Sequence, residues 1–337
     1  MSTLREVAER AGVSLATAWR VVNSSTSVRP ATREKVERAM RELLYVVPRA
    51  ETDAVGAIGL LVPEFGNPVF ATLAQAMETY ARRAGLATIL CNTAGSANRE
   101  VDYVHMLLER RVEGMVFISA EVTDVRGEHA HYAQLIDRGA RLVFVNGASE
   151  KLPVASVGVD ERAAGRIATE HLIELGHRRI GFVAGNAYAS PTREKLLGRE
   201  EALRTAGLGS LSLVAHASFS VAGGRQALRA LVQNAGADRP TGVICSSDLM
   251  AIGALVEARA LGLRVPHDLS IVGFDGVDAA EWTDPPLTTV EQPIGVIAKT
   301  TIDALRTQID DPDQALPNYL FRPSLRAGGT TTPPAAT

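Results

Sequence analysis

From Ile58 onward, short apolar segments alternate with amphipathic helices, and this alternation constrains the fold more than any other feature of the chain. Strands joined by helices in this order form parallel sheets that helices cover on both faces. Eight strand candidates form two sets of four that divide near residue 158. They are AIGLLVP, LATILC, GMVFI and RLVFV, then RRIGFVAG, LSLVAH, TGVIC and DLSIVGF. We therefore expect an α/β protein with two doubly wound lobes.

Three short helices precede the lobes. Thr3 and Glu6 have the spacing of a capping box, and Gly12 is placed to end the first helix. Ser14 is suited to cap the second helix and Pro30 to begin the third. The predicted core positions are Leu4, Val7, Ala8, Ala11, Ala18, Val21, Val22, Val36, Ala39, Met40, Leu43 and Leu44. Residues 1–46 should form one small helix-turn-helix headpiece.

Charge is distributed unevenly along the chain. Residues 1–50 carry nine Lys or Arg against five Asp or Glu, although the formal net charge of the whole chain is -3. The basic end is therefore the part suited to lie near phosphates. The N-terminus has no secretory signal and the chain has no run of 18 apolar residues, so we expect a cytoplasmic protein with no membrane partner. Cys91 and Cys245 lie in apolar segments, which indicates buried thiols; no metal or cofactor is expected.

The second helix is the predicted DNA-reading element. Its first exposed side chains include Leu15, Ala16 and Arg20. The guanidinium of Arg20 matches the O6 and N7 acceptors of guanine, a pairing that contributes about 1 to 3 kcal/mol of discrimination. The alternative for Arg20 is a solvated surface arginine. Further candidate DNA contacts are Thr3, Leu4, Ser14, Thr17, Asn23 and Thr32.

The runs LREVAERAGVSLATAWRVVN and VRPATREKVERAMRELLYV resemble the headpiece of the LacI family of bacterial repressors. The stretches LGHRRIGFVAG, SSDLMAIGAL, GLRVPHDLSIVGFD and PPLTTVEQP resemble the sensor of that family, so the likeness covers nearly the whole chain. It implies periplasmic-binding-protein-like lobes, a homodimer, a near-palindromic double-stranded operator and a small effector. We expect a repressor that regulates transcription, associates with the nucleoid when bound to DNA, and is not an enzyme.

The chain departs from the family pattern at two places in the headpiece and at one in the linker. Leu15 and Ala16 occupy the positions where the family carries its operator-specifying pair, and both are apolar. Contact with thymine methyl groups or exclusion of bulky groups should therefore replace hydrogen bonding to base edges. Trp19 stands where the family usually has a small residue, and its indole should contact DNA, a partner or the headpiece core. The linker over 47–57 is shorter than usual and lacks an apolar wedge. We expect the two headpieces to hold the operator without a strong central kink.

The segment from Thr288 should cross back to the first lobe. The expected first lobe comprises 58–158 and 288–317, and the second comprises 159–287 and 318–327. The tail GGTTTPPAAT, residues 328–337, has no apolar face to bury and is predicted to be disordered. His171 and His177 are interpreted as a helix-face histidine and a helix C-terminal cap.

A ligand of such a protein binds between the lobes, at the carboxyl ends of the strands. The resemblance places effector contacts at Phe70, Asp160, Phe219, Ser247 and Asp275. Carboxylates accept hydrogen bonds from paired hydroxyl groups and aromatic rings cover apolar faces, so this set favours a sugar or sugar derivative ahead of a nucleobase. The alternative for each aspartate is a cap on the following helix.

The segment SPTREKLLG adds two further effector candidates. The family usually has an effector-binding arginine three residues before this glycine, and Lys195 occupies that place here. Lysine cannot make the two parallel hydrogen bonds of arginine, and Arg193 is the available substitute in the same stretch.

Two other classes of protein fit the lobes. The first is a cytoplasmic two-lobed α/β enzyme acting on a small polar substrate, because a fold does not determine a function. The chain lacks the phosphate-binding loop, the nucleophile elbow and the metalloprotease motif that would favour catalysis. The second is a solute-binding protein for transport, which the attached headpiece and the missing signal peptide disfavour.

Overall fold

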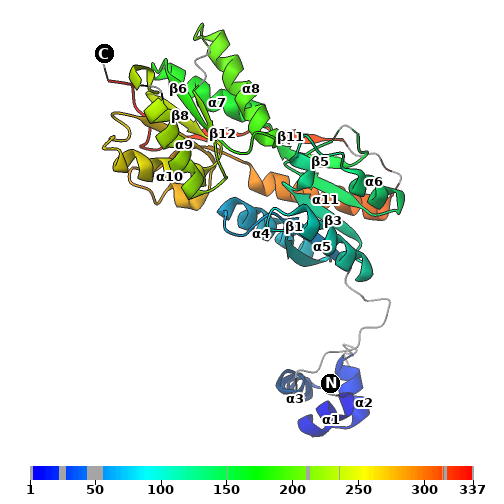
Figure 1. The fold of residues 1–337 in the computed structure, drawn as a ribbon. Helices are drawn as coiled ribbons and strands as arrows, with labels where there is room; N and C mark the ends of the chain where they lie inside the picture. The colour runs from blue at the N-terminus through cyan, green and yellow to red at the C-terminus, as the bar shows by residue number, and fades with distance from the viewer. Residues whose placement is uncertain are drawn as a thin grey trace. The chain divides into compact units, whose positions relative to one another are not determined.

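The computed structural model describes residues 3–22, 28–43, 56–149, 151–209, 213–234, 236–312, 314 and 317–335. The chain divides into two compact units, Met1–Val55 and Gly56–Thr337. The first is the headpiece and the second is the sensor (Figure 1). In the described part of the chain, none of the helices has both the length and the apolar character needed to cross a membrane.

The headpiece contains the three predicted helices, α1 (Leu4–Ala11), α2 (Leu15–Val22) and α3 (Pro30–Glu42). The predicted capping box is present, since the Glu6 backbone N–H donates to Thr3 Oγ1 at 3.3 Å and the Thr3 N–H donates to Glu6 Oε2 at 2.7 Å. Gly12 ends α1 with a φ of 66°. The buried core consists of Val7, Ala8, Ala18, Val21, Val36 and Ala39. Asn23, Leu44 and most of the predicted hinge lie outside the described residues.

The sensor contains two six-stranded sheets, which confirms the expected α/β fold with two lobes. The first sheet has the order β2-β1-β3-β4-β5-β11 and the second β7-β6-β8-β9-β10-β12. Paired strands are parallel except for β10 and β12. The first sheet comprises β1 (Ala57–Val62), β2 (Ala87–Asn92), β3 (Gly114–Ile118), β4 (Leu142–Val145), β5 (Ala155–Val159) and β11 (Tyr319–Phe321). The second comprises β6 (Ile180–Ala184), β7 (Val214–His216), β8 (Gly242–Cys245), β9 (Ser270–Asp275), β10 (Thr288–Glu291) and β12 (Ser324–Arg326).

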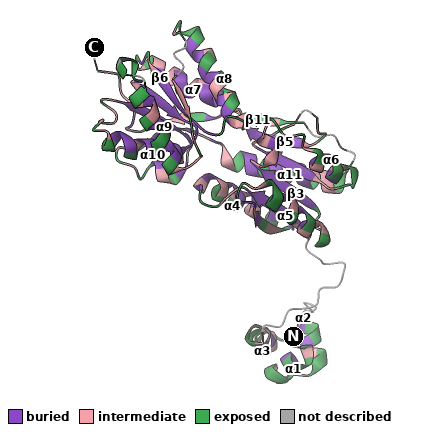
Figure 2. Cartoon of the chain, in the orientation of Figure 1, coloured by how far each residue is buried: buried purple, intermediate pink, exposed green. Residues whose placement is uncertain are grey.

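Helices pack against both sheets, whose inner strands form the buried interior (Figure 2). The first lobe has α4 (Pro68–Arg83), α5 (Ala97–Glu109), η2 (Glu121–Thr123), α6 (Ala130–Asp137) and α11 (Ile294–Asp310). The second has α7 (Glu161–Glu174), α8 (Ser190–Thr205), α9 (Val221–Asn234), η3 (Gly236–Asp238), α10 (Asp248–Ala260) and η4 (Asp278–Ala280). Cys91 and Cys245 are both buried free thiols, as the sequence indicated.

The chain crosses between the lobes at three places, and two of them correct the expected lobe boundaries. The strands β10 and β11 each pair in the sheet opposite to the one expected: β10 lies beside β9 in the second sheet, and β11 lies beside β5 in the first. The crossings therefore run from β5 to α7, from β10 to α11 and from β11 to β12. The alternation of apolar and polar residues identifies a strand but not its partner, because pairing depends on tertiary structure.

The prediction of a disordered tail is wrong for the described residues 328–335. Thr330 is completely buried, its hydroxyl donates to the Ile271 carbonyl at 2.6 Å, and its carbonyl accepts from the Ile271 N–H at 2.9 Å. The Thr332 N–H donates to Ser270 Oγ at 3.1 Å. This segment is ordered by hydrogen bonds to β9 and not by an apolar face. The low hydrophobicity of the sequence was therefore not sufficient evidence for disorder.

His177 is a buried partner of the tail and not a charged helix cap. Its Nε2 lies 3.0 Å from the Thr332 carbonyl oxygen and its Nδ1 lies 2.9 Å from Thr241 Oγ1. Because a carbonyl oxygen only accepts, we assign the proton to Nε2 and leave Nδ1 to accept from the threonine hydroxyl. Burial lowers the pKa of His177, and burial also lowers that of His171.

These pKa shifts predict that the sensor loses stability as the pH falls below about 6.5, the usual histidine value. Below this pH the unfolded chain binds more protons than the folded chain does. The free energy of unfolding therefore falls by at most about 1.4 kcal/mol per pH unit for each histidine. Between pH 7.5 and 5.5, the free energy of unfolding measured in urea should fall less for His177→Gln than for the wild type. The control variant is His105→Gln, because His105 is exposed. Equal slopes for His177→Gln and His105→Gln would contradict the assignment.

Candidate functional site

The outer surface of α2 is partly apolar and partly basic. Ala18 and Val21 are buried in the headpiece core. The exposed side chains of the helix are Leu15, Ala16, Trp19 and Arg20. Leu15 is 47% exposed and Trp19 is 58% exposed, so the structure places the indole at the headpiece surface and not in its core. Large apolar side chains at a surface commonly mark a contact with another molecule.

The hydroxyl groups predicted to touch phosphates have structural partners at the helix starts. Ser14 Oγ accepts from the Thr17 N–H at 3.2 Å and lies 2.8 Å from Thr17 Oγ1. Thr3 caps α1, and Thr32 is half-buried in the first turn of α3. A hydroxyl that accepts one hydrogen bond still has a proton to donate, so capping is compatible with a phosphate contact. Leu4 is half-buried and packs against the headpiece core.

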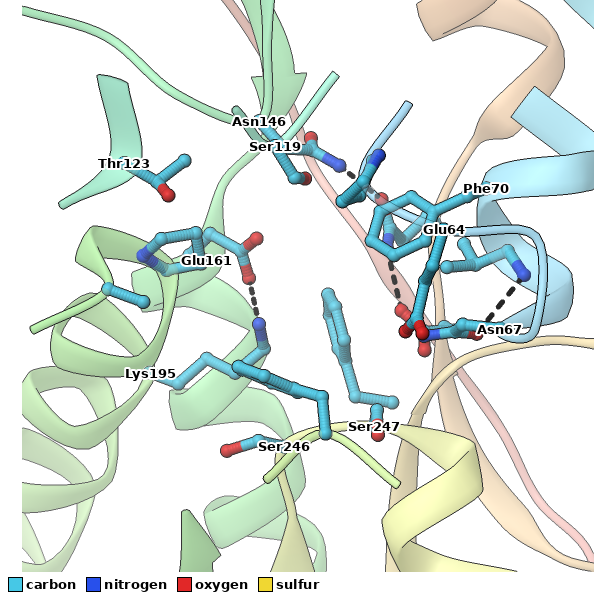
Figure 3. Close-up of a pocket in the computed structure, with 18 residues that line it drawn as sticks. Glu64, Asn67, Phe70, Ser119, Thr123, Asn146, Glu161, Lys195, Ser246 and Ser247 are labelled. Carbon is cyan, nitrogen blue, oxygen red and sulfur yellow. Dashed lines mark hydrogen bonds and ion pairs between the residues drawn. The ribbon is translucent and has the colours of Figure 1, made fainter. Parts of the chain in front are cut away.

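The sensor has a cavity of about 200 Å³ between its lobes. Elements of both lobes line it at the carboxyl ends of strands, the place where open α/β sheets bind ligands. Its polar lining residues are Glu64, Asn67, Ser119, Thr123, Asn146, Glu161, Lys195, Ser246, Ser247, Asp275 and Gln292, and its aromatic ones are Phe70, Phe219 and Phe274. Figure 3 shows how side chains from the two lobes approach one another around this space.

Three of these residues have an unusual backbone conformation. Ser119, Asn146 and Asp275 have φ values of 44°, 54° and 126°, and they follow or end the strands β3, β4 and β9. Residues other than glycine rarely adopt positive φ, and such strained positions cluster at functional sites. The strain therefore marks the strand ends that face the cavity.

Asp275 has one bonded and one unbonded carboxylate oxygen. Gln292 Nε2 donates to Asp275 Oδ1 at 2.8 Å, and Asn146 Nδ2 donates to Gln292 Oε1 at 3.3 Å. Asp275 Oδ2 is buried and has no hydrogen-bond partner among the described residues. Burial, followed by repulsion from Asp248, raises the pKa of Asp275 well above its usual value. An unsatisfied buried acceptor at a cavity is a position where a ligand donor gains a hydrogen bond.

Asp248 supports this strand end from beneath. Its Oδ2 accepts from the backbone N–H groups of Gly276 and Val277, both at 2.9 Å, and its Oδ1 accepts from Thr289 Oγ1 at 2.6 Å. The side chain is completely buried and does not line the cavity. Asp248 therefore holds the turn that follows Asp275.

Lys195 and Glu161 form a buried ion pair at the cavity wall (Figure 3). Lys195 is 4% exposed, and its Nζ lies 3.7 Å from the centroid of the Phe274 ring. A cation over an aromatic ring gains further electrostatic attraction. Burial raises the pKa of Glu161, while the Lys195 ammonium acts in the opposite direction.

A close crossing of α7 and α8 brings these two side chains together. A Cβ atom on Gly198 would lie 1.9 Å from the Arg162 carbonyl oxygen, and one on Gly165 would lie 2.0 Å from the Lys195 carbonyl oxygen. Only glycine permits backbones to approach so closely. The two glycines thus allow the spacing between the helices that carry Glu161 and Lys195.

Two of the predicted effector residues lie outside this cavity. Asp160 caps α7, its Oδ1 accepting from the Ala163 N–H at 2.8 Å, and its neighbour Glu161 lines the cavity instead. Arg193 is exposed on α8, two residues before Lys195, on a different side of the helix from the cavity. The structure brings together Phe70, Lys195, Phe219, Ser247 and Asp275. Ser247 also caps α10, because its Oγ accepts from the Met250 N–H at 3.3 Å.

Several lining residues were missed by the sequence analysis, namely Glu64, Asn67, Ser119, Thr123, Asn146, Glu161, Ser246, Phe274 and Gln292. Asn146 directly follows the predicted strand RLVFV, and Gln292 lies in the quoted stretch TTVEQP. A rule that takes the polar residue after every predicted strand would have found Ser119, Asn146 and Ser246. Positions such as Glu64, Asn67 and Thr123 depend on loop paths that no local pattern predicts.

A second contact joins the lobes beside the cavity. The Val125 N–H donates to the Tyr188 carbonyl at 3.0 Å, and Asp124 forms an isolated antiparallel bridge with Ala189. The Arg126 guanidinium lies 3.8 Å from the Tyr188 ring centroid and 2.6 Å from Asp124 Oδ2. Hydrogen bonding from Arg126 lowers the pKa of Asp124 to about 2. Within the described residues, no cluster of His, Cys, Asp and Glu has the arrangement of a metal site.

Comparisons with known proteins agree along the whole chain. Residues 3–47 match the model described as bacterial regulatory proteins, lacI family, and residues 169–331 match a periplasmic binding protein-like domain. An HTH-type transcriptional regulator from the aml 5' region of Streptomyces limosus is 39% identical over 334 residues, which cover 97% of this chain and 94% of that protein.

Two solved structures share the architecture. A complex of the transcriptional regulator CelR with cellobiose has a TM-score of 0.75 and 31% sequence identity, covering 98% of this chain and 100% of that one. A lac repressor dimer bound to operator and the anti-inducer ONPF has a TM-score of 0.78 and 28% identity, covering 98% of this chain and 99% of that one.

Proposed function

The chain belongs to the LacI family of bacterial regulatory proteins, and from this membership we propose a repressor whose operator affinity is set by a sugar or sugar derivative bound between the lobes. DNA-binding transcriptional regulation is common to its relatives, which are regulators rather than enzymes. The enzyme interpretation therefore has no support from them. The repressor role, the class of effector and the residues that bind it are parts of the proposal.

The unsatisfied Asp275 Oδ2 in the interlobe cavity is the observation that carries the proposal. A sugar hydroxyl would donate to this oxygen, while the amides of Asn146 and Gln292 continue the polar side of the cavity. Phe70 and Phe219 supply apolar surface for the C–H face of a sugar ring. Cellobiose in the CelR complex is the corresponding kind of ligand in a similar protein.

The headpiece supports operator reading through α2. Arg20 would donate two hydrogen bonds to a guanine, and Leu15 with Ala16 would lie against thymine methyl groups. Trp19 is exposed on the same helix and would contact the DNA backbone or a base edge. Phosphate contacts come from Thr3, Ser14, Thr17, Asn23 and Thr32, with Leu4 beside them.

A homodimer would bring two headpieces onto the half-sites of one operator. Exposed apolar side chains near α10 supply a surface for it: Trp282 is 80% exposed and Val256 is 45% exposed. Val256 lines a groove of about 470 Å³ together with Ile252, Leu255 and the segment 283–285, which Trp282 directly precedes in the sequence. Patches of this kind mark protein interaction sites, and the lac repressor in the similar structure is a dimer on its operator.

The test is a DNA-binding titration of the full chain with labelled DNA from upstream of its own gene. Wild type should bind saturably, and Arg20→Ala should lose about ten- to 100-fold in affinity, because about 1 to 3 kcal/mol of base contact is removed. The titration is repeated with monosaccharides and disaccharides at 10 mM. At least one of these sugars should either raise or lower the affinity for the operator.

The variant Asp275→Asn tests whether the effector binds at Asp275. Asparagine keeps an oxygen for Gln292 and replaces the unbonded carboxylate oxygen with a donor. The variant should bind DNA like the wild type without sugar and should lose at least tenfold in response to sugar. A sugar effect that survives this change, or a sugar that is converted to a product, would count against the proposal.

A further inference from the structure

The ion pair of Glu161 and Lys195 gives the effector cavity a feature that the sugar proposal does not explain. Lys195 carries the only ammonium or guanidinium group among the described residues that line the cavity. Three carboxylates line the same space, Glu64, Glu161 and Asp275. A buried lysine beside a ligand site would ordinarily be expected to attract phosphate or carboxylate groups.

Glu161 removes that attraction by its position. It contacts Lys195 directly, both side chains are nearly inaccessible to solvent, and the ammonium rests against the Phe274 ring. The ammonium is therefore already compensated on two sides. An anion that entered would have to displace a carboxylate from a buried pair, and breaking such a pair leaves an uncompensated charge.

Glu64 acts in the same direction, because its carboxyl group lies half-buried at the lining of the same cavity. Like charges brought together in an interface disfavour binding. The cavity thus presents hydrogen-bonding groups without any accessible positive charge.

We propose that Glu161 is a specificity-determining residue that holds Lys195 in an ion pair, so that the cavity accepts uncharged sugars and rejects their phosphorylated or acidic derivatives. This inference rests on the sugar-binding role proposed above. It assigns Glu161 an effect on the choice between ligands, beyond any effect on the strength of binding.

The proposal predicts that Glu161→Gln changes the charge preference of the cavity. Glutamine has nearly the same shape and can still accept a hydrogen bond from Lys195, but it does not neutralise the ammonium. The carboxylate that remains near Lys195 is Asp275, whose burial favours its uncharged form. An anionic ligand then finds a cation that it can approach.

The experiment measures the affinities of matched pairs by calorimetry at constant ionic strength. The pairs are glucose with glucose 6-phosphate, galactose with galacturonate, and cellobiose with cellobionate. Wild type should bind a neutral member at least tenfold more tightly than its anionic partner. Glu161→Gln should reduce this ratio at least tenfold, and Glu161→Gln/Lys195→Met should return it towards the wild-type value.

Glu64→Gln is the matched control, because it removes a lining carboxylate that has no ion pair with Lys195. It should change the ratio by less than threefold. Circular dichroism and sugar-free operator binding establish that each variant is folded.

The possible results separate this inference from the proposed function. A neutral sugar that binds wild type with a ratio unchanged by Glu161→Gln overturns the inference and leaves the proposed function standing. The inference is also overturned if Glu64→Gln and Glu161→Gln change the ratio of the two affinities equally, or if the wild type binds the anionic member of a pair more tightly. If none of the six compounds binds any variant, the sugar proposal fails and the inference fails with it.

Discussion

Replacing Trp282 with glutamate is expected to separate the homodimer and to weaken operator binding by at least about 100-fold. The side chain is 80% exposed beside the apolar groove of α10, so in the monomer its replacement leaves the core intact. In the dimer the change would bury a charge in an apolar contact, which is strongly unfavourable. Each headpiece would then bind its half-site alone and lose the advantage of a linked second site.

Sedimentation and operator titration measure the two parts of this prediction together. Trp282→Glu should sediment as a monomer, whereas Trp282→Phe should remain a dimer with operator affinity near that of the wild type. Leu197→Glu is the matched control, since Leu197 is an exposed apolar residue on α8. A Trp282→Glu protein that remains dimeric at micromolar concentration would show that the subunits meet elsewhere.

Gly198→Ala is expected to destabilise the sensor by about 3 kcal/mol, near the upper end of the usual cost of overpacking. The new Cβ would lie 1.9 Å from the Arg162 carbonyl oxygen, so α7 and α8 must move apart. For a unit of this size the melting temperature should fall by about 5 °C. The separation should also loosen the ion pair of Lys195 and Glu161, which those helices carry.

Gly295→Ala is the comparison for this experiment. A Cβ at Gly295 would meet no atom within 4 Å, and Gly295 lies in α11. Its replacement should be neutral or stabilise the protein by up to about 1 kcal/mol, the helix-forming advantage of alanine over glycine. Thermal unfolding of both variants by calorimetry decides the matter. Similar melting temperatures for the two would mean that the helix crossing tolerates a methyl group.

The headpiece was predictable in detail because its signals are local. The capping box at Thr3 and Glu6, the left-handed Gly12 and the apolar spacing of Val7, Ala8 and Ala18 each act within a few residues. Such signals are readable from the sequence. The strands β1 to β4 and β6 to β9 were predictable for the same reason, whereas β5 was not among the eight candidates.

The lobe boundaries and the tail were harder to predict because they depend on partners far away in the chain. β10 pairs with β9 but is followed by α11, a helix of the other lobe. Thr330 is held by Ile271, and His177 is buried against Thr332. Periodicity identifies an element, whereas its neighbours follow from the assembled fold.

The effector cavity was predictable as a place, but only in part residue by residue. Strand ends led to Ser247 and Asp275, whereas Asp160 caps a helix and its neighbour Glu161 faces the cavity. Adjacent residues at a helix start point in different directions, and their order does not say which one enters the cleft. The lysine at position 195 was visible in the sequence, but its carboxylate partner became apparent only when α7 and α8 were placed together.

The discontinuous second sheet also governs how a nascent chain can mature. β12 covers the outer edge of β10, and residues 330–332 bond to β9, yet both segments leave the ribosome after the strands that they contact. Until then the growing polypeptide exposes an unpaired strand edge, which is a template for pairing with another chain. A nonsense mutation at codon 324 would remove both β12 and residues 330–332 and leave the outer edge of β10 unpaired, so we expect the truncated protein to aggregate.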